Sequence, residues 1–148
     1  PMSEQQAPPP STPYGEPISI AAARKVMAAA EAEASRNQWG VSIAIVDSGG
    51  NLVMLHRLDN AQLSSVRIAE AKARTAVEFR RPTKALEDAV AGGGAGLRVL
   101  TFGASVAEGG VPIVAGGKIV GGIGVSGVAS HPDAQTAMAG AAAAEARA

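Results

Sequence analysis

The feature that most constrains this chain is a strand–turn–strand pattern that occurs twice, with helical sequence before, between and after it. In residues 41–58, β-branched residues alternate with small ones up to a Ser-Gly-Gly-Asn turn, after which the run LVMLHRL completes the pattern. Residues 111–126 repeat it around Gly116-Gly117. Period-two alternation indicates strands, and glycine suits the positive φ angles of tight hairpin turns. Both patterns therefore predict β-hairpins with antiparallel pairing.

Apolar residues at helical spacing surround the two hairpins. The predicted helices are one capped by Ser19 that runs to Arg36, one capped by Ser64 or Ser65 that runs to about Phe79, a short one that begins at Pro82-Thr83 with Thr83 as its cap, and one from Ser130 to the C-terminus. The glycines at 92–96 are predicted to break all regular structure. This order indicates an α+β fold in which helices cover an antiparallel sheet.

The first 17 residues differ in composition from the rest, because they contain six of the nine prolines. Such a segment favours extended conformations, so we expect a proline-rich arm over 1–17 and a single domain over 18–148. Tyr14 either anchors this arm on the body or on a neighbouring subunit, or the arm is a floppy tail. The chain shows neither a membrane-spanning stretch nor the pattern of a secretory signal. We therefore expect a cytoplasmic protein, or a secreted one if a signal peptide has been removed.

The composition excludes several function classes. The 13 basic and 13 acidic residues cancel, so nothing draws the chain to nucleic acid or to an anionic membrane. The absence of cysteine excludes disulfides, thiolate zinc sites, iron–sulfur clusters and thiol nucleophiles. Large apolar residues form only about a fifth of the chain, close to the level below which chains struggle to fold. A core this small predicts a homo-oligomer, because subunit contacts would add burial.

Glycine-rich segments suggest a phosphate-binding loop, but neither of the two common motifs for such a loop is present. Glycines inside a strand mark bulges, or places where another backbone or a flat ligand approaches closely. The strand predicted within 116–127 therefore has either a packing role or a binding role.

The candidate chemical groups are few. His56 and His131 are the only imidazoles, and hence the candidate metal ligands and acid–base groups. His56 lies within a predicted strand, whereas His131 lies at a helix start beside the end of the glycine-rich strand, a position more typical of a site. Arg57 or Lys72 can bind the carboxylate of a small ligand or a haem propionate. The alternative is an internal salt bridge, such as one from Lys72 to Asp59 or Asp47.

Four segments together resemble the GlcG/HbpS family, also called DUF336. They are VSIAIVDSGGNLVMLHRLDNA (41–61), AEAKARTAVEF (69–79), RPT (81–83) and EGGVPIVAGGKIVGGIGVSG (108–127). The resemblance covers roughly residues 18–140. It implies an antiparallel sheet of about five strands flanked by helices, in a profilin-like or roadblock-like arrangement, assembled into dimers and often octamers. Family members include haem-binding redox sensors and a haem- or corrinoid-associated domain of adenosyltransferases.

The family motifs also select site residues. The positions that match and are assigned to ligand binding are Arg57, Asp59, Lys72, Thr75, Gly109, Gly110 and Gly127, to which His131 is added from the residue analysis. Many members carry G-x-x-x-x-Q-D-E after the last strand, whereas this chain has GVASHPDAQ, which retains only Asp133. His131 thus stands where histidine is not typical of the family.

Three hypotheses follow. In the first, the protein is an oligomer that binds haem or another tetrapyrrole: His131 or His56 is the axial ligand, Arg57 or Lys72 neutralises a propionate, and the glycine-rich strand allows flat contact. In the second, it is a cofactor-free catabolic enzyme (an isomerase, hydratase or hydrolase) for a small carboxylated substrate. There His131 and Lys72 would be the catalytic residues. In the third, the motif residues only stabilise the oligomer.

Overall fold

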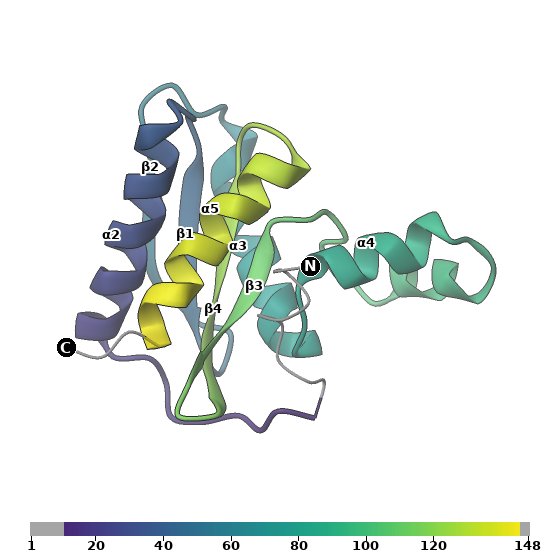
Figure 1. Ribbon diagram of the computed structural model, residues 1–148. Helices are drawn as coiled ribbons and strands as arrows, with labels where there is room; N and C mark the ends of the chain where they lie inside the picture. The colour runs from purple at the N-terminus through teal and green to yellow at the C-terminus, as the bar shows by residue number, and fades with distance from the viewer. Residues whose placement is uncertain (1–10, 146–148) are drawn as a thin grey trace.

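The computed structural model describes residues 11–145 of the chain. Its helices and strands are α2 (Ile20–Arg36), β1 (Ser42–Asp47), β2 (Leu52–Arg57), α3 (Ser64–Phe79), α4 (Thr83–Ala91), the 3-10 helix η1 (Gly94–Thr101), β3 (Gly110–Ala115), β4 (Lys118–Ser126) and α5 (Ser130–Glu145). Helices α2 and α5 lie side by side on one face of the sheet, α3 covers the other face, and α4 with η1 projects sideways (Figure 1). The predicted α+β class is confirmed.

The sheet of the described residues has four strands in the order β2-β1-β4-β3, and every neighbouring pair is antiparallel. Both hairpins are present, but the expected number of about five strands is one too many. Where β1 ends, the N-terminal segment runs beside β4, and Tyr14 forms an isolated parallel bridge with Ile119. Proline has no N–H to donate to a ladder, so Pro13 and Pro17 on either side of this bridge prevent a fifth strand.

The two faces of the sheet pack differently. Ile43, Ile45 and Ile123 are fully buried in the larger core, which includes side chains of α2 and α5. The opposite face packs on α3 through a smaller cluster of mainly small side chains, namely Ala44, Val46, Ala69, Ala73 and Val77. Small side chains allow the α3 backbone to approach the sheet closely.

The glycines of β4 serve this close approach. A Cβ atom added at Gly122 would lie 2.6 Å from the Ala73 carbonyl oxygen, and one at Gly124 would lie 2.0 Å from the Ala69 carbonyl oxygen. A Cβ atom added at Gly121, on the other face of β4, would lie 2.3 Å from the Val46 carbonyl oxygen. The hypothesis that this strand offers a flat face to haem is therefore wrong here, because protein backbone already occupies the space above these glycines.

The serine cap predicted for α2 is present, whereas those predicted for α3 are not. Ser19 Oγ accepts a hydrogen bond from the Ala22 N–H, as predicted for the start of α2. Helix α3 begins at Ser64, but its N-cap is Leu63, and neither predicted serine cap forms. The Ser65 hydroxyl instead donates to the Gln62 carbonyl oxygen. The Ser65 hydroxyl is therefore already engaged and does not cap the helix.

The predicted cap of α4 also has another role. Pro82 is the N-cap of α4, and Thr83 Oγ1 accepts a hydrogen bond from the Gly110 N–H at 2.9 Å. Thr83 therefore ties the root of α4 to the start of β3.

The projecting arm consists of α4 and η1. The prediction that glycines 92–96 break all regular structure is wrong, because η1 begins at Gly94. Gly93 and Gly94 have φ values of +69° and +57° and reverse the chain, and Gly96 packs against the Ala89 carbonyl oxygen in the space that a Cβ would need. Glycine here ends one helix and lets the next fold back on it.

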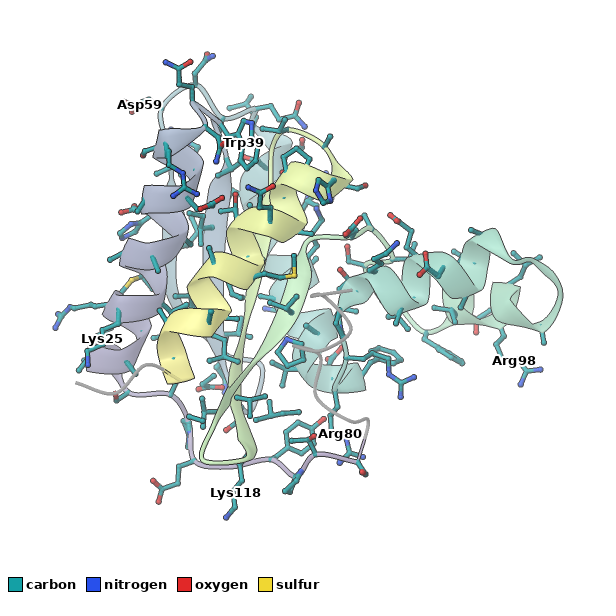
Figure 2. All side chains as sticks on the ribbon, in the orientation of Figure 1. Lys25, Trp39, Asp59, Arg80, Arg98 and Lys118 are labelled. Carbon is teal, nitrogen blue, oxygen red and sulfur yellow. The ribbon has the colours of Figure 1, made fainter. Side chains whose placement is uncertain are left out.

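Of the proline-rich segment, residues 1–10 lie outside the described residues. Tyr14 packs on the body: its hydroxyl donates to the Val77 carbonyl oxygen at 2.7 Å, and the Arg80 guanidinium lies 5.3 Å from its ring centroid. Arg80 lies at the same end of the molecule as Lys118 (Figure 2). Within residues 11–145, no helix has the length and apolar character needed to cross a bilayer.

Candidate functional site

The predicted site residues gather at one end of the sheet, where β2 and β4 end and α3 and α5 begin. Ser42 at the start of β1 pairs with Arg57 on one side and Ser126 on the other. Its hydroxyl lies 2.8 Å from that of Ser65, in the first turn of α3. Asp59 lies at this end, as Figure 2 shows. Residues far apart in sequence are thus brought together around Ser42.

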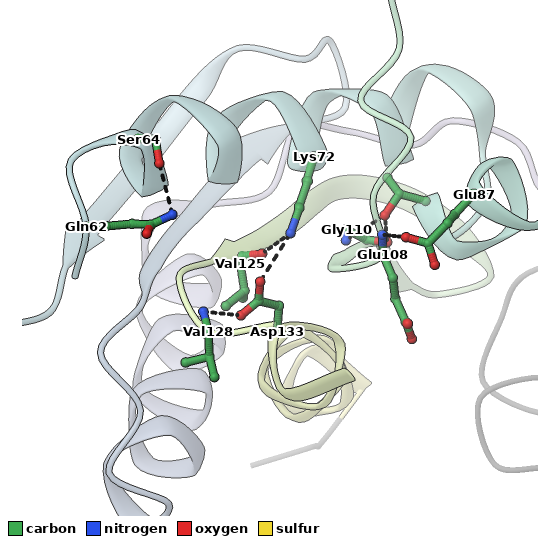
Figure 3. Close-up of polar contacts among 10 residues, drawn as sticks. Gln62, Ser64, Lys72, Glu87, Glu108, Gly110, Val125, Val128 and Asp133 are labelled. Carbon is green, nitrogen blue, oxygen red and sulfur yellow. Dashed lines mark hydrogen bonds and ion pairs between the residues drawn. The ribbon is translucent and has the colours of Figure 1, made fainter. Parts of the chain in front are cut away.

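Lys72 is buried within this region, with 3% of its surface exposed. From α3, its Nζ donates to the Val125 carbonyl oxygen at 2.9 Å and to Asp133 Oδ2 at 3.3 Å (Figure 3). Asp133 belongs to α5, which covers the opposite face of the sheet. The internal salt bridge considered for Lys72 therefore exists, but its partner is neither Asp59 nor Asp47.

Two of the predicted glycines make room for this lysine. A Cβ at Gly109 would lie 2.7 Å from Lys72 Nζ and 3.1 Å from its Cδ, and Gly109 has φ +134°. A Cβ at Gly110 would lie 2.3 Å from the Lys72 carbonyl oxygen. At both positions, the space a ligand would use is filled by atoms of Lys72.

Thr75 and Gly127 make structural contacts of the same kind. Thr75 is buried, and its Oγ1 accepts a hydrogen bond from the Ser105 N–H at 2.9 Å, which holds the loop that precedes β3. A Cβ at Gly127, which has φ +151°, would lie 2.6 Å from the Gly40 carbonyl oxygen. Both residues shape the end of the sheet without presenting a group to solvent.

Three predicted residues do face solvent here: Arg57, Asp59 and His131. Arg57 lies on the α3 side of the sheet, because its pairing partner Ser42 contacts Ser65 of α3. Among residues 11–145, neither Arg57 nor Asp59 forms a salt bridge. His131 lies in the first turn of α5, two residues before Asp133. An imidazole and a guanidinium are thus free to meet a ligand.

The second histidine is placed differently. His56 lies on the edge strand β2, paired with Ile43, and its Nδ1 lies 2.5 Å from Glu31 Oε1 of α2. Helix α5, which carries His131, instead lies over β3 and β4. Within the described part of the chain, no three His, Asp or Glu side chains cluster as a metal site would require.

Sequence reasoning missed two exposed apolar residues at this end of the sheet. Leu63, just before α3, is 84% exposed, and Val128, in the loop before α5, is 47% exposed. Both lie next to turn-forming sequence, and burial there could not be predicted from periodicity. The signal that could have identified them is a large apolar residue in the short segment that precedes a predicted helix start. With His131 and Arg57 they give this end a mixed apolar and cationic surface, which suits an acidic ligand with an apolar body.

Comparisons with known proteins identify the family of this chain. The model of the family described as "Haem degrading protein HbpS-like" matches residues 18–142. Protein GlcG of Escherichia coli K12 is 42% identical over 109 residues, which cover 74% of this chain and 81% of GlcG.

Two solved structures share the fold. The Klebsiella pneumoniae protein ORFY is 30% identical, with a TM-score of 0.83 over 93% of this chain and 97% of its own. A complex of PduOC with haem is 31% identical, with a TM-score of 0.77 over 86% of this chain and 94% of its own. The chain therefore belongs to the HbpS-like family.

Proposed function

We propose that this protein binds haem or a related tetrapyrrole at the end of the sheet where α5 begins. The observation that carries the proposal is the exposed imidazole of His131 beside exposed Val128, at the same end as the unpaired Arg57. Support comes from the description of the family and from the haem complex of the similar PduOC. His131 would ligate the iron, and Arg57 would pair with a propionate.

The donor set suits such a ligand. Haem presents an apolar ring, two carboxylates and an iron that accepts nitrogen ligands. Leu63 and Val128 supply apolar contact, Arg57 a cation and His131 a nitrogen.

The cofactor-free enzyme hypothesis has less support. It used Arg57 or Lys72 to hold the carboxylate and His131 to move a proton, but Lys72 Nζ is buried and bonded to Val125 and Asp133. Arg57 would then hold the carboxylate, and we find no observation that favours proton transfer by His131 over ligation.

Haemin titration tests the proposal. We expect a Soret band that shifts on binding to the wild-type protein, and a loss of at least about tenfold in affinity in His131→Ala. His56→Ala is the matched control, because His56 is already engaged with Glu31, and it should bind as the wild type does. A spectrum unchanged in His131→Ala, or wild-type affinity weaker than ~10 µM, would remove the proposal.

We also propose that the protein is a homo-oligomer, a dimer or a larger assembly, and that the α4–η1 arm takes part in its interface. Leu97, Leu100 and Phe102 on the arm are each about half exposed, and three large apolar side chains within six residues are the kind of surface that a second copy could cover. The arm carries two basic and two acidic residues, one of them Arg98, labelled in Figure 2. Its charge therefore does not oppose contact with a second copy.

Sedimentation at micromolar concentration tests the assembly. The double variant Leu97→Ser/Leu100→Ser should shift the protein toward the monomer. Leu52→Ser, a change of similar exposure on β2, should not. A wild-type protein that is a folded monomer would refute the assembly, and equal effects of the two variants would remove the arm from the interface.

A further inference from the structure

We infer that Lys72 and Asp133 are positioning residues, whose ion pair fixes the loop that carries His131. The inference rests on the proposed function, because it assigns the pair a role in holding the proposed ligand of the iron. Lys72, predicted above as a catalytic and ligand-binding residue, would then not touch the ligand itself.

Both oxygens of the Asp133 carboxylate are used. Oδ2 accepts a hydrogen bond from Lys72 Nζ at 3.3 Å, and Oδ1 accepts one from the Val128 N–H at 3.2 Å (Figure 3). Asp133 therefore connects the loop between β4 and α5 to helix α3 on the other side of the sheet. Lys72 in turn donates to the Val125 carbonyl oxygen, which fixes the end of β4. The loop is thus held at both of its ends by one buried pair.

The exposed residues of this segment have no buried side chain of their own. Val128 and Ala129 lie in the loop, Ser130 and His131 lie in the first turn of α5, and all four are exposed. Asp133 itself has only 4% of its surface exposed. If Lys72 lost its charge, this buried carboxylate would be left without a counter-charge and would move toward water. Such a movement would take Val128 and His131 with it.

Gly109 makes room for the Lys72 side chain to reach Asp133. Lys72 reaches Asp133 past Gly109, where a Cβ would lie 2.7 Å from Nζ and 2.7 Å from the Val125 carbonyl oxygen. A glycine at this position therefore makes the cross-sheet pair possible. Because Nζ is buried and donates to Val125 and Asp133, Arg57 is the predicted cation that remains exposed to meet the carboxylates of a ligand.

Hydrogen exchange of the ligand-free protein tests the positioning role without haem. We expect Lys72→Met to speed exchange of the Val128 amide by about tenfold or more, while amides in the centre of β1 stay protected. Lys72→Met/Asp133→Asn removes both charges but keeps an oxygen that can accept from Val128. The double variant should therefore restore much of the protection. Unchanged exchange at Val128 in Lys72→Met would overturn the inference.

Haemin titration of the same variants separates the two proposals. If Lys72 acts through Asp133, affinity falls in Lys72→Met and recovers in the double variant. If Lys72 touches the ligand, the double variant binds no better than Lys72→Met, which would also overturn the inference. Should Lys72→Met fail to fold, the double variant compared with the wild-type protein gives the same decision. Its affinity stays close to that of the wild type if Lys72 acts through Asp133, and falls if Lys72 touches the ligand. A wild-type protein that does not bind haemin refutes the proposed function alone, since the exchange result stands without it.

Discussion

Replacing Gly124 by alanine should disrupt the contact between α3 and the sheet. The added Cβ would lie 2.0 Å from the Ala69 carbonyl oxygen and 2.4 Å from the Ala73 nitrogen. Real Cβ atoms essentially never come within 3.0 Å of another heavy atom, so α3 must retreat by at least 1.0 Å. Both atoms belong to backbone, and no side-chain rotation can relieve the clash.

The energetic cost follows from this displacement. Overpacking a core typically costs 1–3 kcal/mol, and we expect about 3 kcal/mol here because a whole helix must move. That is a large part of the 5–15 kcal/mol that typically separates folded from unfolded domains. With m values of roughly 1–3 kcal/mol/M, the urea midpoint should fall by about 1–3 M.

Urea denaturation followed by fluorescence of Trp39, the single tryptophan, measures this change. Gly92→Ala is the matched control, because a Cβ there meets only ordinary contacts of 3.5 and 3.6 Å at the end of α4. The control should remain within about 0.5 kcal/mol of the wild type. If Gly124→Ala were equally harmless, the glycines of β4 would not serve helix packing. The hypothesis that they make room for a flat ligand would then have to be considered again.

Three further changes test other contacts. Thr136→Val should raise the free energy of unfolding by up to about 1 kcal/mol in thermal melts, because Thr136 Oγ1 is buried with no hydrogen-bond partner among the described residues; a lower value would contradict this. Tyr14→Phe should cost about 1 kcal/mol in urea, since it leaves the Val77 carbonyl oxygen without its donor; an unchanged midpoint would count against that bond. The hydrogen bond from the Gln135 amide lowers the pKa of Glu33 below its ordinary value of 4.5. Gln135→Leu should therefore reduce the free energy of unfolding at neutral pH and have less effect near pH 2, where Glu33 is protonated and no longer gains from the amide. Equal losses of stability at the two pH values would refute this linkage.

Much of the fold could be predicted because its signals are local. The hairpin turns, the Ser19 cap and the limits of α2 depend on residues adjacent in sequence. The expected fifth strand came from the family resemblance, and Pro13 and Pro17 limit that segment to one bridge. The prediction of a serine cap for α3 failed because the Ser65 hydroxyl donates to the nearby Gln62 carbonyl oxygen and also lies against Ser42 of β1, a contact that local sequence does not reveal.

The site was less predictable, because its decisive contacts are long-range. Lys72 and Asp133 are 61 positions apart, and nothing in their neighbourhoods distinguishes Asp133 from Asp47 or Asp59 as the partner. The role of the β4 glycines was ambiguous for the same reason. Small residues at 69 and 73, one helical turn apart on α3, give the signal that favours a helix over a flat ligand.

The arrangement also gives a reason to place the proposed ligand site at the end of this sheet. Helices cover both faces of the sheet, α2 and α5 on one side and α3 on the other. Along β4, the close approach of α3 depends on glycine and alanine and leaves no space between the layers. Exposed groups free to meet a ligand therefore lie where strands end and helices begin, as His131 and Arg57 do. Because the loop that carries His131 contributes little to the core, substitutions in it can change the ligand while the packing that defines the family stays intact.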